Sequence, residues 1–337
     1  MLKYSQMKLV EINPQDFNNL AITEPNTSFY QTSNWGNFNI NLGYSPIYLG
    51  YVDDANMYYA LTMILIKKGS SFISKKQALC PGGFLINFYD IELVKQFTLD
   101  IKKYISKKGV SELIISPNLT YLTKKGNNDL LIQNLKQIGY EKTKNCSRYT
   151  TYISTIPSSK NTEDIYLKSY VVEDNFDRLF KINSNYKNIF QNMGDYAKFI
   201  VCELDLNKSI TSLNKGITDA KEFIEMHQYE FKYKKKVEKK KLAITQKQDL
   251  LALLDKLAKG RDENPILAVT CMIEYNKKVT LLFLDDKKEY RVLNTLKILN
   301  ERVLKTISQS GYECFDTLKE YNNSTITELI GEFTLRV

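Results

Sequence analysis

Residues 266–286 read ILAVTCMIEYNKKVTLLFLDD. Two apolar runs rich in β-branched residues flank the polar triplet at 276–278, a pattern typical of a β-hairpin. In the next segment, 290–308, apolar residues recur every three to four positions, which predicts a helix. Gly311 follows as a helix-ending glycine, and GYECFDTL then predicts a strand. Residues 266–318 are therefore expected to form a hairpin, a helix and a strand.

An earlier segment, 58–116, follows the same plan. YYALTMILI and SFISKKQALCP predict two strands around a break at KKGS. A helix is expected at 90–107, closed by Gly109, and GVSELIISP predicts the last strand. Hairpin, helix and strand are the central unit of acetyltransferase-like (GNAT) folds. The repeat therefore predicts an α/β protein with mixed sheets and two tandem GNAT-like domains, at 1–153 and 154–337.

A different pattern lies between the two repeats. In 213–231, apolar or aromatic residues recur with the heptad spacing of a coiled coil. They are Leu213, Ile217, Ala220, Ile224, His227 and Phe231. A second apolar series, Ile244, Leu251, Leu254 and Ala258, ends at Gly260. An antiparallel helical hairpin arm is expected at about 207–260, inserted in the second domain. The lysine-rich run KYKKKVEKKK, residues 232–241, falls at its far end.

Composition restricts the compartment and the partners. The chain has 337 residues and a net charge of +9, which suits RNA, anionic lipid headgroups or a phosphorylated substrate, but also a generally basic surface. Its five cysteines form no CxxC pair, which favours free thiols in a reducing cytosol over a disulfide frame or a zinc site. No run of about 18 apolar residues occurs, so a cytoplasmic location is expected.

Most motif-based chemistry is missing from the sequence. The single histidine, His227, lies in the heptad pattern, so histidine-dependent nucleophile schemes and metal sites are not predicted. Gly82 and Gly83 fit either a turn after a strand or exposed backbone N–H groups near a helix start. Asp285 and Asp286 fit either solvated acids or a metal or base site. No metal and no cofactor are predicted, and an enzyme of this kind would act by positioning and electrostatics.

Four strings, taken in order, resemble one known family. They are FYQTSNWGNFNINLGY at 29–44, CPGGFLINFYD at 80–90, AKFIVCELDLNKSITSLNKGI at 197–217, and the stretch from ENPILAVTCMIEYNKK to the segment ending in GYECFD, 263–316. The chain resembles the Fem family (FemA/FemX type) of peptidoglycan-bridge aminoacyltransferases over about 28–335. The resemblance implies transfer of an amino acid from aminoacyl-tRNA to an amino group of a peptidoglycan precursor, on its stem peptide or bridge.

The resemblance also implies partners and site residues. The partners are aminoacyl-tRNA, a lipid-linked or UDP-linked muropeptide, the inner face of the membrane and other Fem-type proteins. The expected substrate-binding residues are Gln31, Trp35, Tyr275, Tyr290 and Arg291. Phe333 and Arg336 are the expected catalytic residues, because they stand where the family keeps a Phe-Lys pair. The expected tRNA contacts are Lys234, Lys235, Lys236, Lys239, Lys240 and Lys241, for which a solvated helix surface and a membrane-surface patch remain alternatives.

Several positions depart from the family pattern. Gly36, Asn37, Phe38 and Asn39 follow Trp35 where the family commonly has a lysine, and Ser116-Pro117 stands for an Asp-Pro pair. Either the acceptor differs, or the chain is a non-catalytic relative that binds a family enzyme, tRNA or precursor. A plain RNA-binding protein would explain only the lysine run. Trp35 also fits a core position, and Arg291 fits an ion pair with Asp285 or Glu289.

Overall fold

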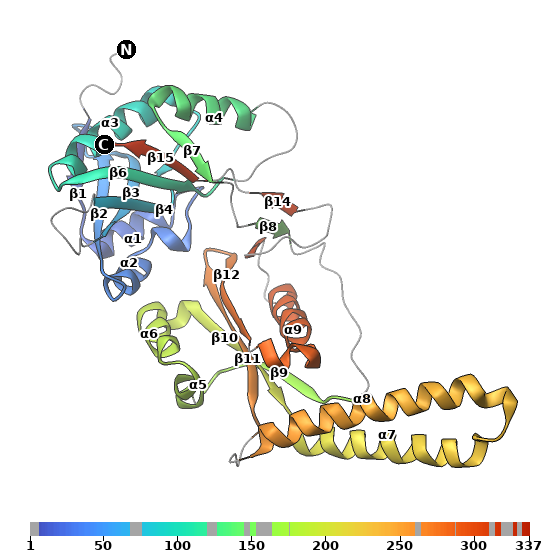
Figure 1. The fold of residues 1–337 in the computed structure, drawn as a ribbon. Helices are drawn as coiled ribbons and strands as arrows, with labels where there is room; N and C mark the ends of the chain where they lie inside the picture. Colours follow the sequence, from blue (N-terminus) through green and yellow to red (C-terminus); the bar gives the residue numbers. More distant parts are fainter. Residues whose placement is uncertain are drawn as a thin grey trace.

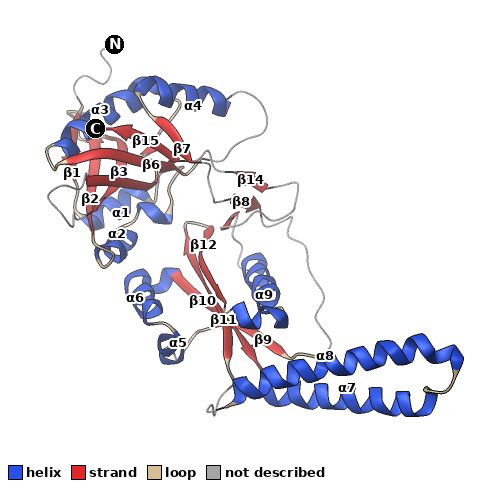
Figure 2. Ribbon diagram, in the orientation of Figure 1, coloured by secondary structure: helices blue, strands red, loops and turns tan. Residues whose placement is uncertain are grey.

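Two β-sheets organise the chain in the computed structural model, and a helical hairpin projects from the second sheet (Figure 1). The structure describes residues 7–67, 76–119, 127–144, 149–152, 164–174, 176–259, 264–286, 288–309, 314–317, 326–328 and 332–337. Helices lie against both sheets (Figure 2). The α/β class with mixed sheets is therefore confirmed.

The first sheet has the strand order β1-β2-β3-β4-β6-β15-β7, with β5 paired to β3. Its strands are β1 (Lys8–Glu11), β2 (Tyr44–Val52), β3 (Tyr58–Lys67), β4 (Lys76–Gly82), β5 (Leu85–Ile86), β6 (Val110–Pro117), β7 (Glu141–Lys144) and β15 (Glu332–Arg336). Only β4 and β6 pair in parallel among these described strands. The accompanying helices are α1 (Pro14–Ala21), η1 (Phe29–Gln31), α2 (Ser33–Ile40), α3 (Ile91–Ser106) and α4 (Asn127–Ile138).

Helix α3 carries the main packing of the first sheet. Asp90 caps its first turn, accepting a hydrogen bond from the Leu93 N–H at 3.2 Å. Phe97, Ile101 and Ile105 recur on one face and are completely buried against the sheet. Beyond the helix, Gly109 adopts φ +76°, the left-handed conformation expected of a residue that ends a helix.

The second sheet has the order β14-β8-β13-β12-β11-β10-β9. Its strands are β8 (Tyr149–Tyr152), β9 (Leu167–Val171), β10 (Ala197–Leu204), β11 (Ile266–Tyr275), β12 (Lys278–Asp286), β13 (Cys314–Thr317) and β14 (Ile326–Glu328). The helices are α5 (Asp177–Ile182), α6 (Ser184–Met193), η3 (Gly194–Tyr196), η5 (Lys288–Leu293) and α9 (Thr295–Gln309). Apolar side chains of α5 and α6 cover one face of the sheet, and those of α9 cover the other.

The predicted duplication is present in the strand pairing. In the first domain β3 and β4 pair antiparallel, α3 follows, and β6 returns parallel to β4. In the second domain β11, β12, α9 and β13 repeat that arrangement. The β11–β12 turn has Asn276 and Lys277 at φ 46° and 59°, as a two-residue hairpin turn with left-handed residues requires. The expected turn at 67–70 and the glycine at 311 fall largely or wholly outside the described residues.

The chain crosses between the two sheets near its middle and again near its end. Strand β8 belongs to the second sheet, although it precedes residue 153. Strand β15, at the C-terminus, lies in the first sheet between β6 and β7. The domain boundary expected at 153 and 154 stays a prediction, and each domain includes a strand from beyond it.

The arm consists of α7 (Leu206–His227), η4 (Phe231–Tyr233) and α8 (Lys234–Ala258), and its helices run antiparallel (Figure 2). Leu213, Ile217 and Ala220 of α7 are buried, as are Val237, Leu254 and Leu257 of α8. Phe231 was also expected in the apolar contact between the two helices, and this prediction was wrong. Helix α7 ends at His227, and the Phe231 side chain is 91% exposed in the connecting turn. None of the described helices is long and apolar enough to cross a membrane.

Candidate functional site

The carboxyl ends of β4 and β6 lie side by side in the first sheet. These strands are parallel, and they end together at Gly82 and Pro117. The crevice outside the carboxyl ends of parallel strands is where open α/β sheets bind ligands. Gly82 and Gly83 have φ +78° and +72°, and a Cβ on Gly83 would lie 2.5 Å from the Pro117 Cα. The two glycines therefore form a tight turn after a strand, the first of the two readings of the sequence.

The segment 26–31 contacts these two strand ends. The Asn118 side-chain amide donates to the Thr27 carbonyl at 3.2 Å, and the Asn118 N–H donates to the Gly82 carbonyl at 3.1 Å. A Cβ on Gly82 would lie 3.1 Å from the Ser28 Oγ, so the two segments touch. These backbone and side-chain contacts hold residues 26–31, which include the start of the family-like stretch 29–44, against the ends of β4 and β6.

Gln31 is part of this attachment. Its side chain is completely buried, and its amide donates to the Pro81 carbonyl at 2.7 Å and to the Met63 carbonyl at 3.1 Å. Its Oε1 accepts from the Met63 N–H at 2.6 Å. Gln31 was expected to bind substrate, but here its amide bonds to backbone and its side chain has no exposed surface. In the structure Gln31 therefore holds η1 to β3 and β4, and its expected substrate-binding role stays a prediction.

An aromatic cluster joins the first domain to the second. The Phe29 ring centroid lies 6.0 Å from that of Trp35, and 6.2 Å from those of Tyr196 and Tyr275. Trp35 also packs on Phe38 at 5.3 Å, and both contact the second-domain core. The structure therefore brings Trp35 and Tyr275 to the same interdomain contact, and their expected substrate-binding role stays a prediction.

Polar groups of the β11–β12 turn reach the same region. The Lys278 ammonium donates to the Thr27 carbonyl at 3.4 Å, and the Asn276 amide donates to the Ile22 carbonyl at 3.3 Å. Burial raises the pKa of Tyr275, so its hydroxyl stays protonated at neutral pH. No sequence motif indicated a role for Lys278 or Tyr196. For Lys278 the only local signal was its place directly after the two-residue turn.

A second set of polar contacts supports this junction between α2 and α6. The Asn34 amide donates to the Asn192 carbonyl at 2.9 Å, and the Asn41 amide donates to the Asn188 Oδ1 at 2.8 Å. Together with the aromatic cluster, these bonds hold the second domain against the N-terminal segment of the first.

Tyr290 and Arg291 lie elsewhere. They follow the far end of β12, about 25 Å along the strand from Lys278. The Arg291 guanidinium donates to both carboxylate oxygens of Asp286, at 2.7 and 2.9 Å, and Tyr290 is buried at the base of the arm. The ion-pair interpretation of Arg291 is thus present, with Asp286 as the partner. Asp285, beside it, accepts from the Tyr186 hydroxyl.

Phe333 and Arg336 lie on β15 in the first sheet. The Phe333 side chain is completely buried in the first-domain core, opposite Ile115 of β6. Arg336 is exposed and stands opposite Glu112, toward the amino end of β6. Neither lies at Pro117, the end of β6 that meets the second domain, so their expected catalytic role stays a prediction.

The six lysines expected to contact tRNA lie in the first turns of α8. This part of α8 is at the tip of the arm, away from both sheets (Figure 1). Their expected role also stays a prediction.

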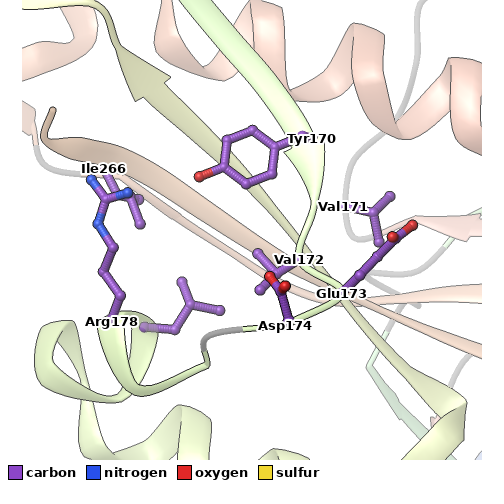
Figure 3. A pocket seen from close by; sticks show the side chains of 8 residues that line it. Tyr170, Val171, Val172, Glu173, Asp174, Arg178 and Ile266 are labelled. Atoms are coloured by element: carbon purple, nitrogen blue, oxygen red, sulfur yellow. The ribbon is translucent and has the colours of Figure 1, made fainter.

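A pocket of about 250 Å³ lies at edge strand β9 (Figure 3). The Arg178 guanidinium donates to Glu203 at 2.8 Å and also to the Asn264 carbonyl, and the Tyr170 hydroxyl donates to Glu203 at 2.7 Å. The charge of Arg178 is thus balanced within the protein. None of the residues expected from the sequence lines this pocket.

Comparison with solved structures defines the class of fold. The chain is similar to FemX, with 15% identity, a TM-score of 0.61, and 98% of this chain and 97% of that chain covered. It is also similar to a tandem GNAT protein from the clavulanic acid biosynthesis pathway, with 7% identity, a TM-score of 0.56 and 98% of each chain covered. The protein therefore has the tandem GNAT fold.

Comparison with protein families goes one step further. The model of the FemAB family matches residues 12–181, which include the family-like string at 29–44 and the strand ends described above. The chain belongs to the FemAB family, and the resemblance inferred from the sequence is confirmed. A comparison with curated proteins gives no match.

Proposed function

We propose that the protein transfers an amino acid from aminoacyl-tRNA to an amino group of a peptidoglycan precursor. The observation that carries this proposal is the junction at which Tyr275 and Lys278 of the second domain contact Phe29 and Thr27, in the segment that lies against the carboxyl ends of β4 and β6. The family membership and the tandem GNAT fold support it. The acceptor is a lipid-linked or UDP-linked muropeptide, and the reaction takes place on the cytoplasmic side of the membrane.

The reaction needs charge stabilisation more than it needs a nucleophile from the protein. The acceptor amine attacks the ester carbonyl, a C–N bond forms, and the C–O bond to the tRNA ribose breaks. The proton lost by the amine goes to the departing ribose hydroxyl. Negative charge develops on the carbonyl oxygen, and a positioned ammonium or hydroxyl stabilises it in a water-poor site. Lys278 and Tyr275 supply these two groups at the junction.

The test is transfer from tRNA charged with glycine, alanine or serine to both kinds of pentapeptide precursor. We expect Lys278→Gln to lower the rate about 100-fold, the usual effect of removing one oxyanion donor. Lys278→Arg should restore part of that rate, because it restores the charge. Lys187→Gln, which changes an exposed lysine on α6, is the matched control and should be unchanged. Thermal unfolding of each variant checks that the fold is intact.

The two arginines named from the sequence are tested in the same assay. Because neither lies at the junction, Arg291→Ala and Arg336→Ala should each retain activity. If Arg336→Ala alone lost activity, the result would indicate that the catalytic centre lies at β15. No activity of the unaltered protein with any donor and either precursor would reject the enzyme and favour the non-catalytic relative, which binds a family enzyme, tRNA or precursor.

A further inference from the structure

The tip of the arm exposes large apolar side chains. Tyr229 and Phe231 are 92% and 91% exposed, the highest values among the large hydrophobic residues that the structure describes. Met226, in the last turn of α7, is 69% exposed, and Leu242, about 12 Å along α8 from its first residue, is 60% exposed. Scattered exposed apolar residues are ordinary, but a cluster at one end of a rod marks an interaction surface. We call Met226, Tyr229 and Phe231 the apolar tip.

The turn beneath the apolar tip is already packed without these residues. His227 lies between the rings of Phe223 and Tyr233, with centroids 4.7 and 4.3 Å away. Its Nδ1 bonds the Glu230 Oε1 at 2.6 Å, and the Tyr233 N–H donates to the Glu230 carbonyl at 3.0 Å. The turn is therefore ordered by its own contacts. Tyr229 and Phe231 bury almost none of their surface against it, so they contribute little to the packing of the turn.

Positive charge surrounds the apolar tip. Lys234, Lys235, Lys239 and Lys241 are exposed in the first turns of α8, and no described acidic side chain forms an ion pair with them. The amino end of α8 adds the partial positive charge of the helix dipole. A single acid, Glu238, interrupts the run. Exposed apolar side chains flanked by lysines are complementary to a surface whose outer layer is negatively charged and whose inner layer is apolar.

We propose that the apolar tip and its four lysines bind the surface of an anionic lipid bilayer. Tyr229 and Phe231 enter the boundary between headgroups and acyl chains, where aromatic rings are favoured. The four ammonium groups lie at the level of the lipid phosphates, and each contributes attraction to an anionic membrane. The tip is the free end of a two-helix rod and lies away from both sheets, so a flat bilayer can reach it without meeting the rest of the protein (Figure 1).

The arm then sets the distance between membrane and protein body. Helix α7 has 22 residues, which corresponds to about 33 Å. Bound by its tip, the arm holds the two sheets near the bilayer without inserting a helix into it.

Vesicle co-sedimentation at low salt tests the proposal. The full chain is mixed with vesicles of phosphatidylcholine alone, or of phosphatidylcholine with phosphatidylglycerol. We expect binding to the anionic vesicles, and at least about tenfold weaker partitioning for Tyr229→Ser/Phe231→Ser and for the four-lysine glutamine variant. The matched controls are Tyr89→Ser, which changes an exposed aromatic on the first domain, and glutamine at Lys95, Lys107, Lys181 and Lys187. Both controls should bind as the unaltered protein does.

A second measurement separates insertion from simple charge attraction and from RNA binding. In Phe231→Trp the added indole should be quenched by brominated acyl chains, whereas Trp35, in the first domain, should not be. Binding of uncharged tRNA is measured on the same variants. The proposal is overturned if the indole at 231 is not quenched, or if the tip variants lose tRNA binding while vesicle binding is unchanged. The latter outcome would assign the lysines to tRNA.

Discussion

Gln31 and Met63 exchange two hydrogen bonds: the Gln31 Oε1 accepts from the Met63 N–H, and the Gln31 amide donates to the Met63 carbonyl. Strand β3 pairs with β4 at residues 65–66 and with β5 at residues 60–61, so Met63 lies between the two pairings. A side-chain amide has the same donor and acceptor as a peptide group. Gln31 thus takes the place of a missing strand residue, and so holds the family-like string to the sheet.

The first prediction follows from this bond pair. Gln31→Ala should lower the free energy of unfolding by about 2–4 kcal/mol, because it leaves buried backbone groups of Met63 and Pro81 without partners. Urea denaturation measures the loss. Gln77→Ala, at an exposed position of β4, should change stability by no more than about 0.5 kcal/mol. Equal effects of the two substitutions would contradict the role assigned to Gln31.

The second prediction concerns the C-terminal strand. Phe333→Ala should destabilise the protein by about 3–5 kcal/mol, because it opens a cavity in the first-domain core. Arg336→Ala, three residues on and exposed, should have little effect on stability. The comparison is made by thermal and urea unfolding. If Phe333→Ala unfolded like the unaltered protein, β15 could not lie between β6 and β7.

The third prediction is a loss of stability at alkaline pH. Burial raises the pKa of Cys80 and of Cys202 from 9.0 to about 12. Between these values the unfolded chain releases the thiol proton while the folded chain keeps it, so this stability is present below about pH 9 and is lost as pH rises toward 12. Each thiol should contribute about 1.4 kcal/mol per pH unit in that window. Urea unfolding with reductant, repeated at pH values from 8 to 10, gives the free energy of unfolding as a function of pH. This free energy should fall less steeply with pH in Cys202→Ala than in the unaltered protein. An equally steep fall in both proteins would refute the raised pKa of the Cys202 thiol.

The fourth prediction uses the single tryptophan as a reporter of the interdomain contact. Phe29 is 2% exposed and packs against Trp35 and Tyr275. Phe29→Ala should shift the Trp35 emission to longer wavelength and increase its quenching by iodide, because water enters the contact. Tyr89→Ala, at an exposed position of the first domain, is the control and should leave the emission unchanged. A Phe29→Ala spectrum identical to that of the unaltered protein would place Trp35 outside the contact.

Local patterns were sufficient for the secondary structure and the repeat. The apolar runs around 276–278 predicted a hairpin, and β11 and β12 form it. The heptad spacing predicted the arm, and Leu213, Ile217 and Ala220 are buried in it. These predictions held because hairpin and helix periodicities depend on residues close in sequence.

The candidate site was predicted only in part, and the reason differs by residue. Trp35 and Tyr275 both pack against Phe29 at the junction, but Tyr290 and Arg291 lie at the opposite end of β12. Lys278 carried no signal beyond its turn. Which end of a strand faces the other domain is decided by how the two sheets pack, and no local pattern records it.

The sequence alone determined that the chain builds two related α/β units and a helical arm, because periodicity, turn residues and glycines act over a few positions. Only the tertiary structure decided that β15 completes the first sheet, that Gln31 replaces a strand residue at Met63, and that Phe231 faces solvent beyond the end of α7. Each of these depends on contacts between segments, or on the residue at which a helix ends. Such choices minimise the free energy of the whole fold, and any single stretch is compatible with several of them.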